Sequence, residues 1–515
     1  MTTTMVPAAW GQEQQRWQGF YRQHLISRLE WSAKFVRQAS REEVRRRIES
    51  LLTLLQDAQR MFAACAPQFL SLVDALHPWP LRWGYWHAWE RQLRFLLQHA
   101  SHLSLAQRAV YMVHLAEILE TTGRKEEASR LYPQAMKLAS SSKAAIPLAE
   151  VTSAWVSWTL GNGNLHEAQR ALALLRTHRL PPVAQVYEAL SHMRILRRQG
   201  RFQAGVDVAV QTLETLQTHA IQDAALMAQL WAQKAVLEWD LDCFVDSLES
   251  LQQALALHRS LGDRFAEGSI LGDIGLVYWS MFALQQAEDA LRQSLRISEE
   301  LNARMRMVVE IGNLGLVYLT RGALSRAVRY LQRQYLLARR TDYVREINRA
   351  RGNLGIALFC QKKYRRALPL ILADREFSRT HNLLASWGLA STHLGVAYAM
   401  LNSPEDSERM FAEALEVANQ IGSEVLHALI WRAQALTSPP KEAVFYLRQA
   451  LDVAVRHHRP MDEAACLLLL AKYAPDEDTG PAWWRRGMEI LQQLQATAWL
   501  EGATRDNPPI LPFVR

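Results

Sequence analysis

Cysteine is scarce in this sequence of 515 residues, which holds only Cys65, Cys243, Cys360 and Cys466. Each cysteine lies more than 100 residues from the next, so no two form the close pair that a zinc knuckle or a redox motif requires. We expect four small apolar core residues in a protein of the reducing cytosol.

Long apolar runs are also missing. No stretch approaches the roughly 18 uncharged apolar residues of a membrane span. The first ten residues lack the positively charged start and apolar core of a secretion signal. The sequence therefore predicts a cytoplasmic protein that contacts no membrane.

Glycine and proline are few, at 23 and 18 residues, while 49% of the residues are hydrophobic and 21% are charged. This balance is typical of a folded, helical chain rather than a disordered one. A chain of this length exceeds what a single core supports, so it must hold several domains or one array of repeats.

The common motifs of catalysis are absent. The sequence has no Gly-x-x-x-x-Gly-Lys-Ser/Thr, His-Glu-x-x-His or Gly-x-Ser-x-Gly string, and its Gly161-Asn162-Gly163 lies in an expected turn between helices. The adjacent His457 and His458 could touch a metal, but neighbouring residues do not share a helical face. We therefore predict a non-enzymatic protein without cofactor or metal site.

What the sequence does contain is a period of 40 residues. The strings LGDIGLVY, IGNLGLVY, RGNLGIAL and THLGVAY carry one glycine each at the same place, namely Gly275, Gly315, Gly355 and Gly395. Twelve residues after each glycine stands a small residue, Ala287, Ala327, Ala367 or Ser407. Small residues at this spacing let a second helix approach the first closely, so each unit is predicted to be an antiparallel helix pair.

This pattern resembles the tetratricopeptide repeat, and its 40-residue length is similar to the variant found in kinesin light chains, Rap-type bacterial regulators and MalT-like sensors. The same frame extends less regularly over residues 103–501, most regularly over 265–420, and gives about ten units. The resemblance implies an all-α, right-handed α-solenoid whose concave surface is the default binding site.

Residues 1–102 precede the repeats and are rich in tryptophan. They predict two long amphipathic helices, 12–38 and 41–64, the second opened by Ser40 with Glu43 three residues later. After the break at 77–80, a short helix running to Ala100 is crowded with aromatic residues, Trp83, Tyr85, Trp86 and Trp89. We expect these aromatics to cap the array; the alternative is an aromatic binding pocket. A similar segment precedes the repeats of MalT-like signalling NTPases, whose nucleotide motif this chain lacks.

The family resemblance also suggests a binding face. In that family the residue two before the key glycine lines the groove, which here gives a polar ladder of Gln233, Asp273, Asn313, Asn353 and His393. The matching asparagine of related arrays holds the backbone of a bound peptide, a role that suits an amide. Alternatively, Asn313 and Asn353 bond neighbouring helices within the array. Trp239 and Trp279, further along the same face, form either apolar pockets in the groove or packing between turns.

Charge gives a second indication of partners. Between Arg321 and Arg379 stand fifteen basic residues against four acidic ones, an excess larger than the net charge of +8 of the whole chain. Arg349 lies one helical turn before Asn353 and is predicted to point into the groove, with Arg345 beside it. These residues suit an acidic peptide or a C-terminal carboxylate.

We therefore predict a protein-protein interaction scaffold or sensor, in bacterial-type signalling or regulation, that binds a peptide or partner domain in the groove. The alternative is a nucleic-acid-associated accessory factor that uses the basic face at 321–379. The last segment, 502–515, contains prolines and cannot be helical. We expect a frayed tail there; the alternative is docking on its own groove or on a partner.

Overall fold

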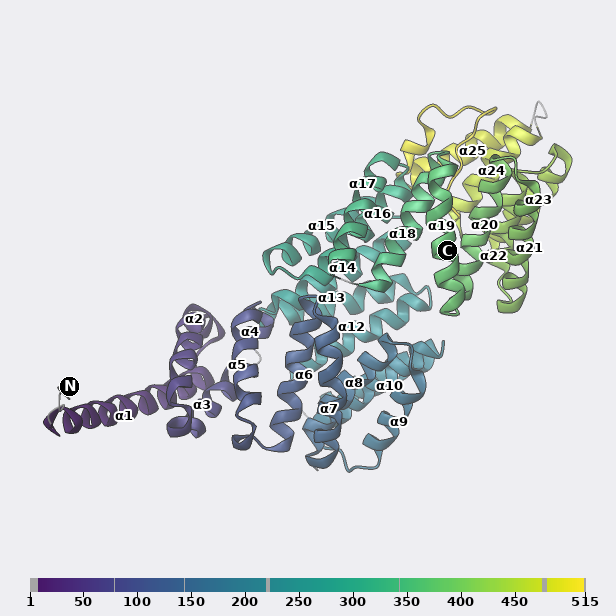
Figure 1. The fold of residues 1–515 in the computed structure, drawn as a ribbon. Coiled ribbons are helices and arrows are strands. Elements are labelled where there is room, and N and C mark those ends of the chain that lie inside the picture. Colours follow the sequence, from purple (N-terminus) through teal and green to yellow (C-terminus); the bar gives the residue numbers. More distant parts are fainter. Residues whose placement is uncertain are drawn as a thin grey trace. The chain divides into compact units, whose positions relative to one another are not determined.

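The computed structural model describes residues 8–77, 79–142, 144–218, 223–341, 343–474 and 479–513, without the side chains of 8–15. Every regular element in these ranges is a helix, as predicted (Figure 1). None of the described helices is long and apolar enough to cross a membrane. The chain divides into two compact units, Met1–Ile270 and Leu271–Arg515, and α14 contains the boundary.

The first unit opens with helices that precede the repeats. They are α1 Ala8–Gln38, α2 Arg41–Ala58, η1 Gln59–Met61, α3 Phe62–Leu76, α4 Trp79–Arg82, α5 Trp86–Gln98 and η2 Ala100–His102. Ser40 caps α2 in the predicted capping box with Glu43. The predicted end of that helix at residue 64 is wrong, because α2 ends at Ala58 and the backbone of Cys65 is not helical.

The tryptophans of this segment are buried. Trp83, Trp86 and Trp89 are at most 7% exposed. The Trp86 ring meets Phe265 edge-on at 5.3 Å between ring centroids, and α5 packs on α6, the first helix of the repeats. These aromatics therefore serve the packing of the first unit.

Four helix pairs complete the first unit. They are α6 Leu105–Thr121 with α7 Lys125–Ser142, α8 Ala145–Gly161 with α9 Leu165–Arg176, α10 Pro182–Arg198 with α11 Phe202–Thr218, and α12 Ala224–Asp240 with α13 Phe244–Leu261. Each helix packs on the next one along the chain, the contact pattern of a solenoid.

The second unit continues the pattern from α14. Its helices are α14 Arg264–Ser280, α15 Leu284–Glu300, α16 Arg304–Arg321, α17 Leu324–Arg340, α18 Val344–Cys360, α19 Tyr364–Thr380, α20 Leu384–Met400, α21 Pro404–Ile421, α22 Glu424–Ala435, α23 Pro440–Arg456, α24 Pro460–Tyr473, α25 Thr479–Gln493 and η3 Thr497–Leu500.

The recurring glycine explains why the pairs close up. A Cβ on Gly315 of α16 would lie 2.7 Å from Leu331 Cδ2 of α17, a distance that real Cβ atoms do not reach. Ala327, the small residue twelve positions later, is fully buried. The predicted antiparallel helix pairs are thus confirmed. Their close spacing depends on a residue without a side chain, Gly315, and on one with a small side chain, Ala327.

First helices of successive pairs also contact each other. Within the second unit α16 touches α18, α18 touches α20, and α20 touches α22. We call α16, α18, α20 and α22 the first-helix row.

The described part of the C-terminal segment is not frayed, so that expectation is wrong; it packs on its own array, as the alternative had it. Residues 503–513 are non-helical, as their prolines require, but Leu511 is 3% and Phe513 1% exposed. Both belong to the core cluster that also contains residues of α16, α18 and α20. Apolar burial therefore fixes a segment that has no regular backbone hydrogen bonds.

Candidate functional site

Asn313 and Arg349 form a bridge between neighbouring first helices. Arg349 Nη1 of α18 donates to Asn313 Oδ1 of α16 at 3.0 Å, and Nη2 donates to the Val309 carbonyl at 3.2 Å. Arg349 Nε also donates to Glu346 at 2.8 Å. Asn313, which is 1% exposed, thus bonds a neighbouring helix, the second of the two roles considered for it. Arg349 is held in the same network.

One repeat earlier, the position of Asn313 is taken by Asp273, and an ion pair replaces the hydrogen bond. Arg306 of α16 pairs with Asp273 of α14 at 3.6 Å and with Glu310 at 2.7 Å. Glu310 is fully buried, and burial raises the pKa of its carboxyl against the attraction of Arg306. This ion pair, like the Asn313 bridge, ties successive first helices together.

Asn353 and Arg345 differ from the residues above, because they are accessible. Asn353 is partly exposed, and no described residue hydrogen-bonds to its side chain. Arg345, at the start of α18, is exposed and makes no ion pair within the described ranges. These two side chains remain able to contact a partner.

His393 of α20 is fully buried between two aromatic rings. Its ring stands edge-on to Phe359 at 5.1 Å and to Phe513 at 5.0 Å between centroids. Its Nδ1 lies 2.8 Å from the Leu389 carbonyl, so this nitrogen carries the hydrogen. Burial, aided by repulsion from Arg432, lowers the pKa of His393 to about 4.

Arg432 of α22 is the functional candidate that the sequence interpretation missed. Its side chain is 2% exposed, and Nη2 donates to the Pro512 carbonyl at 2.8 Å and pairs with Asp462 at 3.3 Å. Its guanidinium carbon lies 4.5 Å from the centroid of the Phe513 ring. A signal existed, since the three preceding repeats carry Leu316, Ile356 and Val396 at the equivalent position.

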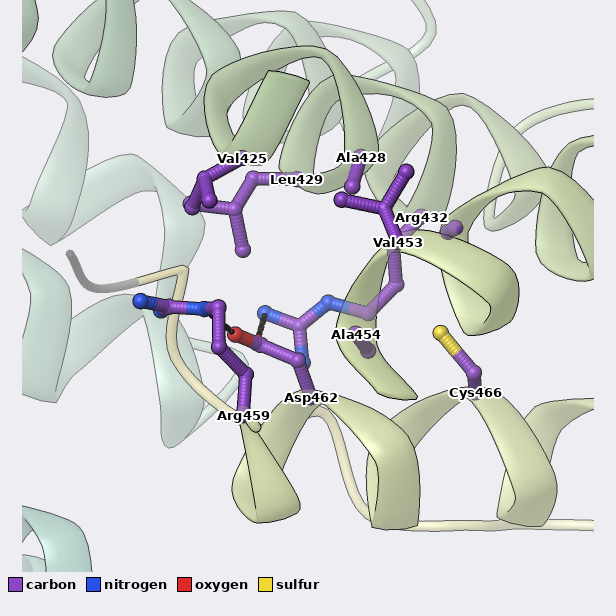
Figure 2. A pocket seen from close by; sticks show the side chains of 10 residues that line it. Val425, Ala428, Leu429, Arg432, Val453, Ala454, Arg459, Asp462 and Cys466 are labelled. Carbon is purple, nitrogen blue, oxygen red and sulfur yellow. Dashed lines mark hydrogen bonds and ion pairs between the residues drawn. The ribbon is translucent and has the colours of Figure 1, made fainter. Parts of the chain in front are cut away.

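A small pocket lies beside Arg432, between α22, α23 and α24 (Figure 2). Asp462 sits at its floor, and Arg459 donates to the second oxygen of this carboxylate at 2.6 Å. Leu429 and Val453 supply apolar walls. Asp462 thereby fixes the Arg432 guanidinium and balances its buried charge.

Two further contacts are made by residues that precede Phe513 in the C-terminal part of the chain. Trp499 Nε1 donates to the Thr320 carbonyl of α16 at 2.9 Å, and Lys362 Nζ donates to Asn507 at 2.9 Å. Trp279 Nε1 donates to the Thr320 hydroxyl at 2.8 Å, so Trp279 packs between helices rather than lining an empty pocket.

In the first unit, Gln233 of α12 accepts a hydrogen bond from Arg194 of α10 at 3.1 Å. Arg194 also donates to Ser153 of α8 at 2.8 Å, and burial lowers the pKa of its guanidinium to about 10. Trp239, at the end of α12, is partly buried.

A second polar cluster of this unit was not predicted. His114 of α6 lies 3.1 Å from Glu150 of α8. Although burial disfavours its charge, this contact raises the pKa of His114. Like Gln233, the cluster joins consecutive first helices.

The basic residues between 321 and 379 lie mostly on second helices and turns. Eleven of the fifteen are exposed. Among the exposed ones only Arg333 and Arg379 pair with a described acid, Glu299 and Glu376 respectively. Nine exposed cations thus have no acidic partner in the described ranges.

No group of three or more His, Cys, Asp or Glu side chains able to hold a metal occurs in the part of the chain that the structure describes. The described cysteines are all free thiols, and three of the four are buried as expected; Cys243 is exposed, so the expectation of a core residue is wrong there.

Comparison with known proteins is consistent with this architecture. Residues 226–300 match the family model of the tetratricopeptide repeat. No curated protein sequence matches the chain. Among solved structures, a Rap protein in complex with competence and sporulation factor has 13% identity and a TM-score of 0.55, covering 67% of this chain and 98% of its own. The apo form of RapI has 12% identity and a TM-score of 0.51, covering 68% and 98%. At these identities the likeness shows a common fold.

Proposed function

We propose that this chain, a tetratricopeptide-repeat protein, is an interaction scaffold or sensor that holds an extended peptide or partner segment against its first helices. The observation that carries the proposal is that the first-helix row already holds an extended segment. Residues 511–513 lie without secondary structure on α18, α20 and α22, fixed by a backbone hydrogen bond and an aromatic anchor. These are the means by which a groove binds a peptide.

The accessible residues of α18 extend this face. Asn353 offers a donor and an acceptor to a peptide backbone, and Arg345 offers a charge-assisted bond to an acidic side chain or a C-terminal carboxylate. Since Asn313 and Arg349 are engaged with each other, Arg345 and Asn353 carry the polar recognition in this proposal.

The setting we propose is bacterial-type signalling or regulation in the cytoplasm. It is supported by the fold shared with Rap proteins, one of which was solved with competence and sporulation factor bound. The free cysteines fit a reducing compartment. Residues 1–102 cap the array in this proposal, and no catalytic step is assigned to the chain.

The test is affinity capture with the full chain from a nuclease-treated lysate of its own cells. Three baits are compared: wild type, the row variant Arg345→Glu with Asn353→Ala, and an outer control, Arg366→Glu with Gln332→Ala. The control changes exposed residues of α19 and α17 by the same chemistry. A protein held by wild type and control but lost from the row variant supports the proposal. Identical captures from all three baits would contradict it.

A second function is favoured by the nine exposed cations at 321–379 that have no acidic partner in the described ranges. We infer that this basic face would bind nucleic acid through phosphate contacts, which weaken steeply with salt. The affinity for a labelled nucleic-acid duplex and for a labelled single strand is measured at about 50 and about 200 mM salt. Binding through phosphate contacts weakens strongly over this range. A fall of less than threefold, or no effect of Arg339→Glu with Arg340→Glu, would contradict this alternative.

A further inference from the structure

The C-terminal segment follows the path that a bound peptide would take. Trp499, just before the segment, donates to the Thr320 carbonyl of α16. The chain then passes Lys362, which follows α18, and its described part ends with Phe513, which contacts α18, α20 and α22. It therefore crosses successive first helices instead of adding another helix pair.

The positions that it touches repeat along the row. Phe359 stands four residues after Gly355, as Trp279 does after Gly275, and His393 stands two before Gly395. The Phe513 ring lies 6.0 Å from the Phe359 ring and 5.0 Å from the His393 ring. The Phe513 ring thus contacts two positions of the repeat, the one four residues after the key glycine and the one two residues before it.

Two buried polar atoms at this anchor keep unused bonding capacity. His393 Nε2 and Arg432 Nε have no hydrogen-bond partner among the described residues. Because Nδ1 carries the hydrogen, Nε2 is an acceptor that needs an N–H or O–H donor. Arg432 Nε needs an acceptor. Leaving such atoms unpaired costs free energy, so a ligand that supplies both bonds would hold the site more tightly.

The described tail is fixed by few polar links. Apart from the Ala503 amide, which donates to the Leu500 carbonyl of η3 at 3.2 Å, the hydrogen bonds that join 503–513 to helices in the described ranges are those of Arg432 with Pro512 and of Lys362 with Asn507. Most of its attachment is apolar burial of Pro508, Leu511, Pro512 and Phe513. Such a segment can leave while the helix pairs beneath it keep their own contacts.

We propose that residues 503–513 are an intramolecular occupant of a peptide-binding site centred on Arg432 and His393, displaced by an extended, proline-containing partner segment with an aromatic anchor. This rests on the proposed function and names its ligand class and its regulation. The partner places its aromatic ring under Arg432 and its backbone carbonyl on Nη2. Until it binds, the tail keeps the site closed.

The test uses the full chain and a labelled peptide of the tail sequence NPPILPFVR. The variant Phe513→Ala weakens the internal anchor, so we expect it to bind the peptide at least tenfold more tightly than wild type does. The matched control peptide NPPILPAVR should bind neither chain. Equal binding of NPPILPFVR to wild type and variant, or binding to neither, would overturn the proposal.

A second measurement needs no variant. Hydrogen exchange of wild type should show amides of 503–513 exchanging at least tenfold faster than those in the middle of α20, and exchanging faster still when excess NPPILPFVR displaces them from the site. Tail amides exchanging at the rate of the α20 interior, with no response to peptide, would show a tail that is only part of the fold.

The two proposals fail differently. The capture experiment changes Arg345 and Asn353, which make no hydrogen bond or ion pair with 503–513, whereas the peptide experiment changes Phe513. Peptide binding in trans with unchanged captures leaves the tail inference standing and removes the scaffold face on α18. Altered captures without peptide binding do the reverse.

Discussion

Arg432 and Phe513 lie 81 positions apart in the chain and in direct contact, with the guanidinium carbon 4.5 Å from the ring centroid. The same guanidinium bonds the Pro512 carbonyl and is balanced by Asp462. A buried charge, a ring and a backbone acceptor thus meet at one point. This contact joins the last described residue of the chain to the first-helix row.

Replacing Phe513 by alanine should destabilise the second unit by about 2–4 kcal/mol, because a fully buried ring is lost and Arg432 is exposed to a cavity. Urea denaturation followed by tryptophan fluorescence measures the change. Phe445→Ala is the matched control: that ring is 61% exposed, so its removal should cost less than about 0.5 kcal/mol. Equal effects of both variants would contradict the docked tail.

Gly322, after α16, combines two constraints. Its φ is +87°, and a Cβ there would lie 2.7 Å from the Trp499 backbone nitrogen. Gly322→Ala should therefore cost about 2–3 kcal/mol, the left-handed backbone plus a displaced η3. Thermal unfolding measures it.

Gly422 after α21 is the control for Gly322. It has a φ of +61° but nothing within 4 Å of its Cβ position, so Gly422→Ala should cost only about 1 kcal/mol. If the two substitutions were equally costly, Trp499 would not be pressed against the turn as the structure has it.

The helix pairs could be predicted from sequence because their determinants are local and repeated. Gly315 and Ala327 are needed wherever two helices approach closely, and the 40-residue period shows the same demand several times. The end of α2 is harder to predict, because the break at 59–61, where the backbone of Met61 is not helical, lies within an otherwise continuous apolar pattern.

The candidate site was less predictable, since its contacts are long-range. Asn313 has the residue type and repeat position of a peptide ligand, but Arg349, 36 residues later, occupies its oxygen. The role of Pro512 and Phe513 depends on Arg432, and their own apolar, non-helical neighbourhood is compatible with either a frayed tail or docking on the array. Only the charge of Arg432 at an otherwise apolar repeat position gave a hint.

The Arg349 bridge should matter for stability more than for partner binding. Arg349→Met removes the partner of the buried Asn313 Oδ1 and should cost about 2 kcal/mol. Arg345→Met on the exposed surface should cost less than about 0.5 kcal/mol while weakening capture of an acidic partner. Denaturation of both variants, with the capture assay beside it, would contradict this division if Arg345→Met proved the more destabilising of the two.

His393 should make the second unit sensitive to acid. Its folded pKa is about 4 and its ordinary value 6.5, so the unfolded chain binds more protons between these values, and stability falls as the pH decreases from 6.5 to 4. The groups that face the ring are Arg432, whose charge opposes protonation, the Leu389 carbonyl, which favours it, and the apolar rings of Phe359 and Phe513.

The His393 contribution is roughly 2–3 kcal/mol and should be missing from His393→Leu. Free energies of unfolding of both chains at pH 8 and pH 4.5 measure the difference, in which the titration of other groups cancels. If His393→Leu lost as much stability on acidification as wild type, the imidazole would be able to take up a proton in place, and its enclosure by Phe513 would have to be given up.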